Sequence, residues 1–279
     1  MSRNTATIDG SKEKRRYLTL LAGTVALIGS LFIGIAAGAV PITLREVFEV
    51  IQGVTQSENY RIIYYIRMPR VICAALTGTN LALAGCILQG ILRNPLADPG
   101  IIGVTAGAGL AAMALMLISP ELTYFVPFAA FGGAVVASIV VFLLAWEHGI
   151  HPLRLILAGV AIAAFFGGGS AALSVFFSDR IQGTVNWMAG GFAGNSWRHV
   201  VMILPYSAVG IVATMCSYRK LNALQLGDDV AASLGLNVER VRFFLLALSA
   251  LLAASAVSVA GLLGFVGLII PHIMRLIVG

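Results

Sequence analysis

The sequence has very little charge for its length, and this scarcity excludes most soluble folds. Asp, Glu, Lys and Arg make up 11% of the 279 residues, whereas 59% are hydrophobic. Ordinary soluble domains carry about 25% charged residues, because their surfaces face water. The chain is therefore predicted to be a membrane protein that contacts the lipid bilayer. Its net charge of +6 is attributed to membrane topology and not to nucleic-acid binding.

The motifs of common enzymes are also missing. The sequence contains no Gly-x-x-x-x-Gly-Lys-Ser/Thr phosphate loop, so ATP binding by that route is not expected, and no His-Glu-x-x-His zinc motif. Cys73, Cys86 and Cys216 lack metal-ligand spacing and are interpreted as packing residues. We therefore predict no catalytic residue, no metal and no cofactor bound by this chain.

Long charge-free windows predict an all-α, polytopic transmembrane bundle. Each window reaches the roughly 20 residues that a helix needs to cross the hydrocarbon core of a bilayer. The last is long enough to hold a full span and a short one, split near Gly261, which makes about eight spans. The uncharged segment 181–197 is interpreted as interfacial. The windows are 17–44, 71–92, 99–120, 122–146, 155–178, 199–218 and 243–274.

The distribution of Lys and Arg predicts the orientation. With residues 1–16 as a cytoplasmic tail and 17–279 as the transmembrane domain, twelve Lys and Arg residues lie on the cytoplasmic side and six outside, as the positive-inside rule favours. Ala37-Gly38-Ala39 resembles a signal-peptide cleavage site. An uncleaved first span is favoured, because the apolar run is longer than a usual signal core.

The cytoplasmic loop of about 218–242 is the longest polar region between predicted spans. Gly227 and Gly235 bracket a short predicted helix, Asp228–Leu234, and its first turn carries two aspartates where the helix dipole favours negative charge. This loop is predicted to dock another protein, and the alternative is a solvated connection.

Polar residues within and beside the second window suggest functional contacts. Asn80 and Gln89 are expected to face other helices or a cavity, because exposure to lipid would be costly. Interhelical hydrogen bonding is the alternative to a role in a pathway. Arg67 and Arg70 are predicted to present positive charge outside, with interfacial anchoring as the alternative.

The last apolar stretch is interrupted by Gly261, Gly264, Gly267 and Pro271, followed by His272. Gly and Pro free backbone polar groups that lipid cannot satisfy, so the break must face protein or a water-filled cavity. Broken helices of this kind often lie beside transport pathways. A packed helix end with a proline kink is the alternative.

Together these segments resemble the FecCD-type permeases, the membrane subunits of type II ABC importers for iron-siderophores, haem and cobalamin. The resemblance runs from about residue 60 to the end of the chain, with the motifs in the family's order. The matching stretches are Arg67–Arg70, Asn80 through Gln89, Asn94–Gly107, Trp187–Gly191, Leu226–Gly235 and Gly261–Arg275.

The resemblance implies a homodimer in the bacterial inner membrane, with two cytoplasmic ATPase subunits that use ATP and Mg²⁺ and an extracytoplasmic substrate-binding protein. Arg67 and Arg70 resemble the arginines that pair with the binding protein, and the fifth span would line the pathway. Seven residues resemble the segment that couples to the ATPase: Leu226, Gly227, Asp228, Asp229, Ala231, Leu234 and Gly235. The pathway and its gate would involve Asn80, Gln89, Asn94, Leu96, His151, Pro152, Gly264, Gly267, Pro271 and His272.

The family has ten helices, whereas about eight are predicted here, so the chain is expected to be C-terminally incomplete. An iron-siderophore or related metal chelate is the expected substrate, with haem or cobalamin as the alternatives. An ion-driven secondary carrier is disfavoured, because every acidic residue lies outside the charge-free windows. A truncated subunit that does not transport is the remaining alternative.

Overall fold

The structure is a computed structural model that describes residues 3–56, 58–147, 149 and 152–278, and all its regular elements are helices. The predicted all-α transmembrane bundle is confirmed. The α-helices are α1 (Arg3–Ala36), α2 (Leu44–Ile51), α3 (Met68–Leu92), α4 (Val104–Ile118), α5 (Val126–Ala145), α6 (Pro152–Phe176), α7 (Gln182–Met188), α8 (Trp197–Gln225), α9 (Asp228–Ser233), α10 (Val238–Ala260) and α11 (Val266–Val278).

Six of the described helical segments are long and apolar enough to cross a membrane, and two of the eight predicted spans are shorter. Helix α4 has 15 residues and α11 has 13, so their lengths are about 23 Å and 20 Å. Both are shorter than the roughly 30 Å hydrocarbon core of a bilayer. The short span after Gly261 agrees with the predicted split of the last window, whereas the window 99–120 overestimated α4, because a backbone break shortens that helix. A 3₁₀ turn, η2 (Pro99–Ile102), precedes α4, and the loop from Gly261 precedes α11.

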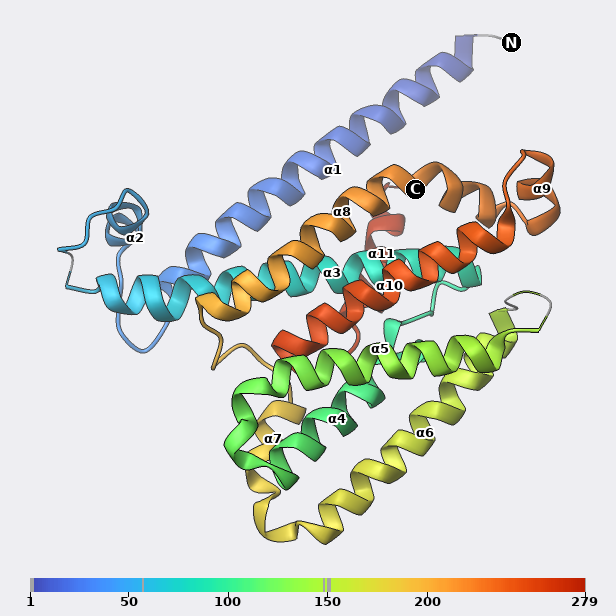
Figure 1. Ribbon diagram of the computed structural model, residues 1–279. Helices are drawn as coiled ribbons and strands as arrows, with labels where there is room; N and C mark the ends of the chain where they lie inside the picture. Colours follow the sequence, from blue (N-terminus) through green and yellow to red (C-terminus); the bar gives the residue numbers. More distant parts are fainter. Residues whose placement is uncertain (1–2, 57, 148, 150–151, 279) are drawn as a thin grey trace.

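Helix α3 is the central helix of the bundle. It continues a π-helical turn, η1 (Ile62–Arg67), and packs against α8, α10 and α11 (Figure 1). Ile87, Leu88 and Ile91 are buried on it, together with Leu246 and Leu252 of α10. Because the middle of α3 contacts protein on several sides, polar residues on this helix can be satisfied by neighbouring helices.

Helices α4, α5 and α6 form a second layer beside α10 (Figure 1). Helices α4 and α5 cross where Gly107 faces Gly133, and a Cβ atom on either glycine would overlap the other's carbonyl group. Helix α6 lies at the edge of the bundle. It buries Leu155 and Gly159 against its neighbours, whereas Phe165 and Phe176 are exposed.

Helix α2 is amphipathic and buries Val47 and Val50. A capping box joins Thr43 and Glu46 at its start. The backbone hydrogen bond from Thr43, followed by side-chain hydrogen bonds from Asn59 and Thr43, holds the pKa of Glu46 below its ordinary value. The box therefore fixes the start of α2 at Leu44.

The basic side chains separate to two ends of the bundle. We call one end the Arg93 end; it carries Arg15, Arg93, Arg154, Arg240, Arg242 and Arg275. We call the opposite end the Arg198 end; it carries Arg45, Arg61, Arg67, Arg70, Arg180 and Arg198. At the Arg93 end, Arg15 donates to the carbonyl of Val278 at 2.6 Å, and at the Arg198 end Arg198 donates to that of Tyr124 at 2.9 Å. In Figure 1, α9 marks the first end and α2 the second.

Candidate functional site

The predicted coupling segment is a short helix at the Arg93 end. Helix α9 spans Asp228–Ser233, close to the predicted Asp228–Leu234. Gly227 and Gly235 have φ angles of +122° and +82°, in the region that L side chains rarely adopt, so these two positions favour glycine. The glycines therefore set the direction of the chain on both sides of α9.

Asp228 ties this helix to two membrane helices. Its carboxylate accepts from Arg242 of α10 at 2.8 Å and 3.0 Å, and it also pairs with Arg93 at the end of α3. Arg93 itself has a left-handed backbone conformation and donates from Nε to the carbonyl of Leu224 at 3.0 Å. The start of α9 is thus bound to α3, α8 and α10 through one carboxylate and two guanidinium groups.

Two opposing effects determine the pKa of Asp228. Partial burial raises it, but the hydrogen bond and charge of Arg242, followed by those of Arg93, outweigh burial and leave the pKa below its ordinary value. Asp228 is therefore an anion at neutral pH, as its pairing with two arginines requires.

The remaining predicted coupling residues divide between the bundle and the solvent. Ala231 is fully buried, whereas Leu226 and Leu234 are 65% and 63% exposed, and Asp229 is also exposed. Ala231 and Asp228 therefore attach α9 to the bundle. Leu226, Leu234 and the carboxylate of Asp229 remain exposed to solvent.

Gln89 brings together three of the residues predicted for the gate. Pro271 has no N–H, so the carbonyl of Gly267, four residues earlier in α11, loses its usual helical partner. Gln89 of α3 donates to this carbonyl at 3.4 Å and to that of Leu268 at 3.2 Å, and its Oε1 accepts from Arg275. The amide of Gln89 thus satisfies backbone groups around the proline break and is itself oriented by an arginine.

The close contact between α3 and α11 depends on glycine. A Cβ atom at Gly85 would overlap the carbonyl of Gly267, and one at Gly267 would lie 2.9 Å from the carbonyl of Leu81. Since the two backbones touch here, the interrupted helix α11 packs directly on the central helix. Pro271 is buried in this contact and His272 is exposed.

The turn between α3 and α4 lies at the same end. Asn94 accepts from the N–H of Leu96 at 2.9 Å and Asp98 from that of Gly100 at 2.8 Å, so side chains shape the turn. Leu96 is 66% exposed. Pro152 begins α6, Gly264 lies in the loop before α11, and His151 lies outside the described residues.

Asn80 of α3 faces a neighbouring helix, which is one of the two environments expected for it. Asn80 is fully buried between α3 and α10, and its Nδ2 donates to the hydroxyl of Ser255 at 2.9 Å. It makes the interhelical hydrogen bond that was the alternative to facing a pathway. Helix α10 covers this face of α3, which the sequence of α3 does not reveal.

Arg67 does not present its charge at the surface, so the prediction of an outward display is wrong for this residue. It is 8% exposed and donates to the carbonyls of Ile35, Ala36 and Val40 at 2.9, 2.6 and 2.5 Å. The carbonyls of Ile35 and Ala36 lie at the end of α1, where helical partners are missing, and that of Val40 lies in the loop that follows, so an arginine can satisfy them. Arg70 is exposed, as the prediction requires.

The Arg198 end contains a polar cavity of about 730 Å³ beside the predicted interfacial segment. Asn186 and Trp187 of α7, Asn195, His199 and the end of α10 at Ser258–Gly261 contribute to its lining. Gly190 and Gly261 pack closely here, because a Cβ at Gly261 would overlap the carbonyl of Trp187. The segment around Trp187 is therefore a helix and loop that lines a hollow, and not a span.

Sequence analysis missed three arginines as site residues: Arg93, Arg242 and Arg275. Arg242 and Arg275 border or interrupt the last apolar window. A guanidinium group next to a membrane span needs polar partners, and this requirement could have marked both arginines as site residues. Their partners, Asp228 and Gln89, are more than ten residues away in sequence, so only the folded chain identifies them.

An interrupted helix packed on a central helix, with a polar cluster at one end of a membrane bundle, is an arrangement found in membrane transport proteins. Residues 26–279 match the FecCD transport family, and the chain belongs to this family. Its relatives are permease subunits of import systems, and this chain is a permease subunit of that class.

Individual relatives agree with this assignment. The chain is 38% identical over 269 residues to the Fe(3+)-citrate import system permease protein YfmE of Bacillus subtilis (strain 168), which covers 96% of this chain and 80% of that protein. It is 39% identical over 215 residues to the cobalamin import system permease protein BtuC of Halobacterium salinarum, covering 77% and 58%. A solved chain described as an inward-facing metal-chelate type ABC transporter has a TM-score of 0.77 at 29% identity, covering 94% of this chain and 82% of that one.

Proposed function

We propose that two copies of this chain form the membrane pathway of an ABC importer for a ferric chelate, such as an iron-siderophore. The similarity to an Fe(3+)-citrate permease supports this substrate class, and the similarity to a cobalamin permease keeps cobalamin as the second candidate. The observation that carries the proposal is the attachment of α9 to α3 and α10 through Asp228, because it can transmit force from a partner to the membrane helices.

In this proposal the Arg93 end is cytoplasmic, which places inside the larger of the two sets counted along the full sequence, twelve Lys and Arg residues against six. A separate ATPase subunit, which uses ATP and Mg²⁺, binds α9 from below. The exposed Leu226 and Leu234 supply apolar contacts, and Asp229 supplies charge. Because Asp228 is ion-paired with Arg93 and Arg242, a displacement of α9 moves the ends of α3 and α10 with it.

The pathway itself would lie between two copies. Helix α6 buries only a narrow stripe and exposes small and apolar residues on its remaining surface, including Gly167, Gly168 and Phe165. A smooth apolar wall suits a bulky chelate that must move without tight binding. The contact of α11 with α3 at Gly85 and the amide of Gln89 lie close to the cytoplasmic end, where a gate is required.

At the Arg198 end, which is extracytoplasmic in this proposal, a soluble binding protein would deliver the chelate. Arg70 is exposed there and can pair with a carboxylate of the binding protein. Arg67 contributes indirectly, because it fixes the end of α1 beneath this surface.

The coupling role is tested with Leu234→Glu in the complex of permease and ATPase subunits. A carboxylate in place of a buried interfacial leucine loses apolar area and leaves a charge unpaired, so we expect at least about tenfold weaker association. Transport-dependent ATP hydrolysis in proteoliposomes should fall in parallel. The measurement is the dissociation constant of the purified ATPase subunit for the permease in detergent.

Val54→Glu is the matched control, because Val54 is an exposed apolar residue in a loop at the opposite end. It should leave binding of the ATPase subunit unchanged. Equal affinity of Leu234→Glu and the unaltered protein for the ATPase would show that α9 is not the docking element.

A further inference from the structure

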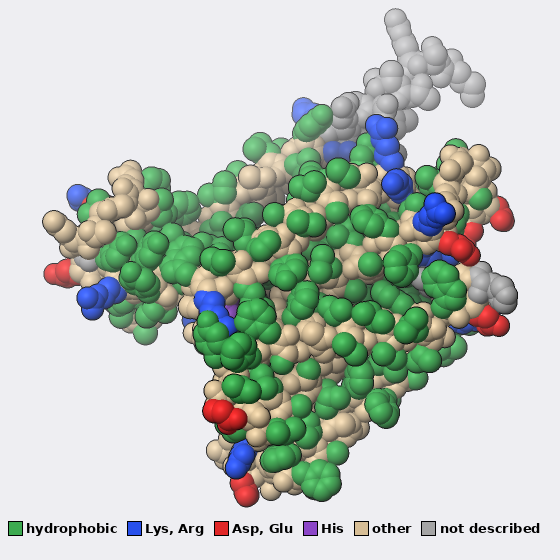
Figure 2. All heavy atoms as spheres, in the orientation of Figure 1, with side chains coloured by type: hydrophobic (Ala, Val, Ile, Leu, Met, Phe, Trp, Pro, Cys, Tyr) green, Lys and Arg blue, Asp and Glu red, His purple; other side chains and the backbone are tan. Residues whose placement is uncertain are grey.

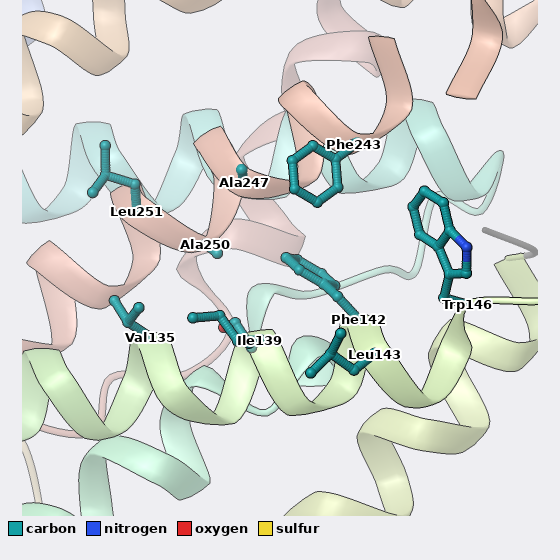
Figure 3. A pocket seen from close by; sticks show the side chains of 10 residues that line it. Val135, Ile139, Phe142, Leu143, Trp146, Phe243, Ala247, Ala250 and Leu251 are labelled. Carbon is teal, nitrogen blue, oxygen red and sulfur yellow. The ribbon is translucent and has the colours of Figure 1, made fainter. Parts of the chain in front are cut away.

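A groove on an exposed apolar side of the bundle is not used by the transport proposal. It has a volume of about 390 Å³ and lies between α5 and α10 (Figure 3). Helix α5 contributes Val135, Ser138, Ile139, Phe142, Leu143 and Trp146, and α10 contributes Phe243, Ala247, Ala250 and Leu251. Ala247 and Ala250 create the hollow, because the larger side chains of Phe243 and Leu251 lie on either side of them along α10.

The lining offers hydrocarbon only. Ser138 is the one hydroxyl-bearing residue of the lining, and its hydroxyl donates within α5 to the carbonyl of Ala134 at 2.9 Å. Ile139, Leu143 and Phe243 are about half exposed or more, so the groove is open along its side. Figure 2 shows this face of the bundle covered mainly by hydrophobic side chains. A hydrocarbon chain is therefore the ligand that the groove suits.

The length of the groove matches one leaflet of a bilayer. From Val135 to Trp146 the α5 side rises over eleven residues, or about 17 Å. Half of the hydrocarbon core of a membrane is about 15 Å thick. Trp146, at the end of α5, is at the position where tryptophan meets lipid headgroups in membrane proteins. The groove thus has the dimensions of a single acyl chain that enters from the Arg93 end.

Arg240 places a positive charge at the mouth of the groove. It precedes Ala247 by seven residues and Leu251 by eleven, and these spacings put all three on one face of α10. Its side chain is exposed, and among the described residues it forms no ion pair. The neighbouring cations are otherwise engaged, because Arg242 binds Asp228 and Arg154 pairs with Glu147.

From this arrangement we propose that the groove is a binding site for an anionic glycerophospholipid. One acyl chain lies between α5 and α10, and the phosphate lies against the guanidinium of Arg240. An arginine near the membrane surface favours anionic over zwitterionic headgroups by about fivefold. The occupant is thus selected by its headgroup at Arg240 and held by its chain along the alanine hollow.

The test uses quenching of tryptophan fluorescence by phospholipids with brominated acyl chains. The purified full chain is titrated in detergent with brominated phosphatidylglycerol and, separately, with brominated phosphatidylcholine. We expect quenching at about fivefold lower concentration with phosphatidylglycerol. Trp146→Phe should remove this component of the quenching, because the other two tryptophans, Trp187 and Trp197, lie at the Arg198 end.

Three variants separate headgroup and chain. In the Arg240→Gln variant the two lipids should quench at similar concentrations. Arg240→Lys should restore most of the preference for phosphatidylglycerol. Ala247→Leu fills the hollow and should weaken quenching by both lipids. Arg219→Gln is the matched control, because Arg219 is an exposed arginine at the same end on α8, and it should keep the preference.

Two outcomes would overturn the proposal. If Arg240→Gln and Arg219→Gln reduce the preference equally, the lipids respond to general surface charge and not to this site. If Trp146→Phe leaves the quenching intact, or Ala247→Leu does not weaken it, the acyl chain does not occupy the groove. Because Arg240 is exposed, its replacement should leave the fold intact and keep the comparison interpretable.

Discussion

At the residue scale, one carboxylate and two arginines join the coupling helix to the membrane bundle. Asp228 carries both ion pairs, and Arg242 is 6% exposed, so this carboxylate stabilises a nearly buried charge. Removal of the anion weakens the stabilisation of that guanidinium, which is more costly than loss of a surface ion pair.

Asp228→Asn should therefore destabilise the protein by about 1–2 kcal/mol at neutral pH, a value reduced for the partial exposure of the carboxylate. The pKa of Asp228 is lower in the folded state, so its stabilising effect is present above the ordinary pKa of Asp and disappears as the pH falls through the folded value. Thermal unfolding in detergent between about pH 3 and pH 7 measures this. The acid-induced loss of stability should be shallower in the variant, and identical slopes would exclude the ion pairs as its cause.

At the element scale, the packing of α11 on α3 depends on the absence of side chains at their contact. Gly85→Ala should separate the two helices and destabilise the protein by about 3 kcal/mol, because the new Cβ overlaps backbone atoms that cannot move away. Gly78→Ala, on the same helix with open space around it, should be neutral or stabilising by up to about 1 kcal/mol. Chemical denaturation of both variants gives the comparison, and similar losses would mean that helix propensity and not the contact controls this site.

At the scale of the whole molecule, the separation of basic residues predicts which end faces the cytoplasm. In a background without Cys73, Cys86 and Cys216, a cysteine at Gln56 should react with an impermeant maleimide added to intact cells. A cysteine at Ser233 should react only after the membrane is permeabilised. Both residues are exposed, and they lie at the Arg198 and Arg93 ends. Labelling of Ser233→Cys in intact cells would reverse the orientation.

The sequence by itself determined the class of this protein and most of its elements. Charge-free windows mark the membrane helices because lipid excludes charge, and local signals placed α9 within a residue of its observed bounds. Each of these features depends on neighbours in the chain, such as the glycines on either side of α9. Patterns of this kind can be read without knowledge of the fold.

Tertiary structure decided which polar residues meet. The sequence marked Gln89, Gly267 and Pro271 separately, and folding joins them because Gln89 supplies the hydrogen bond that the proline removes. It also turned Arg67 inward to the end of α1 and enclosed Asn80 against Ser255. The partners in these contacts are at least 27 residues apart along the chain. Long-range hydrogen bonds of this kind leave no local pattern, since each depends on how the helices pack.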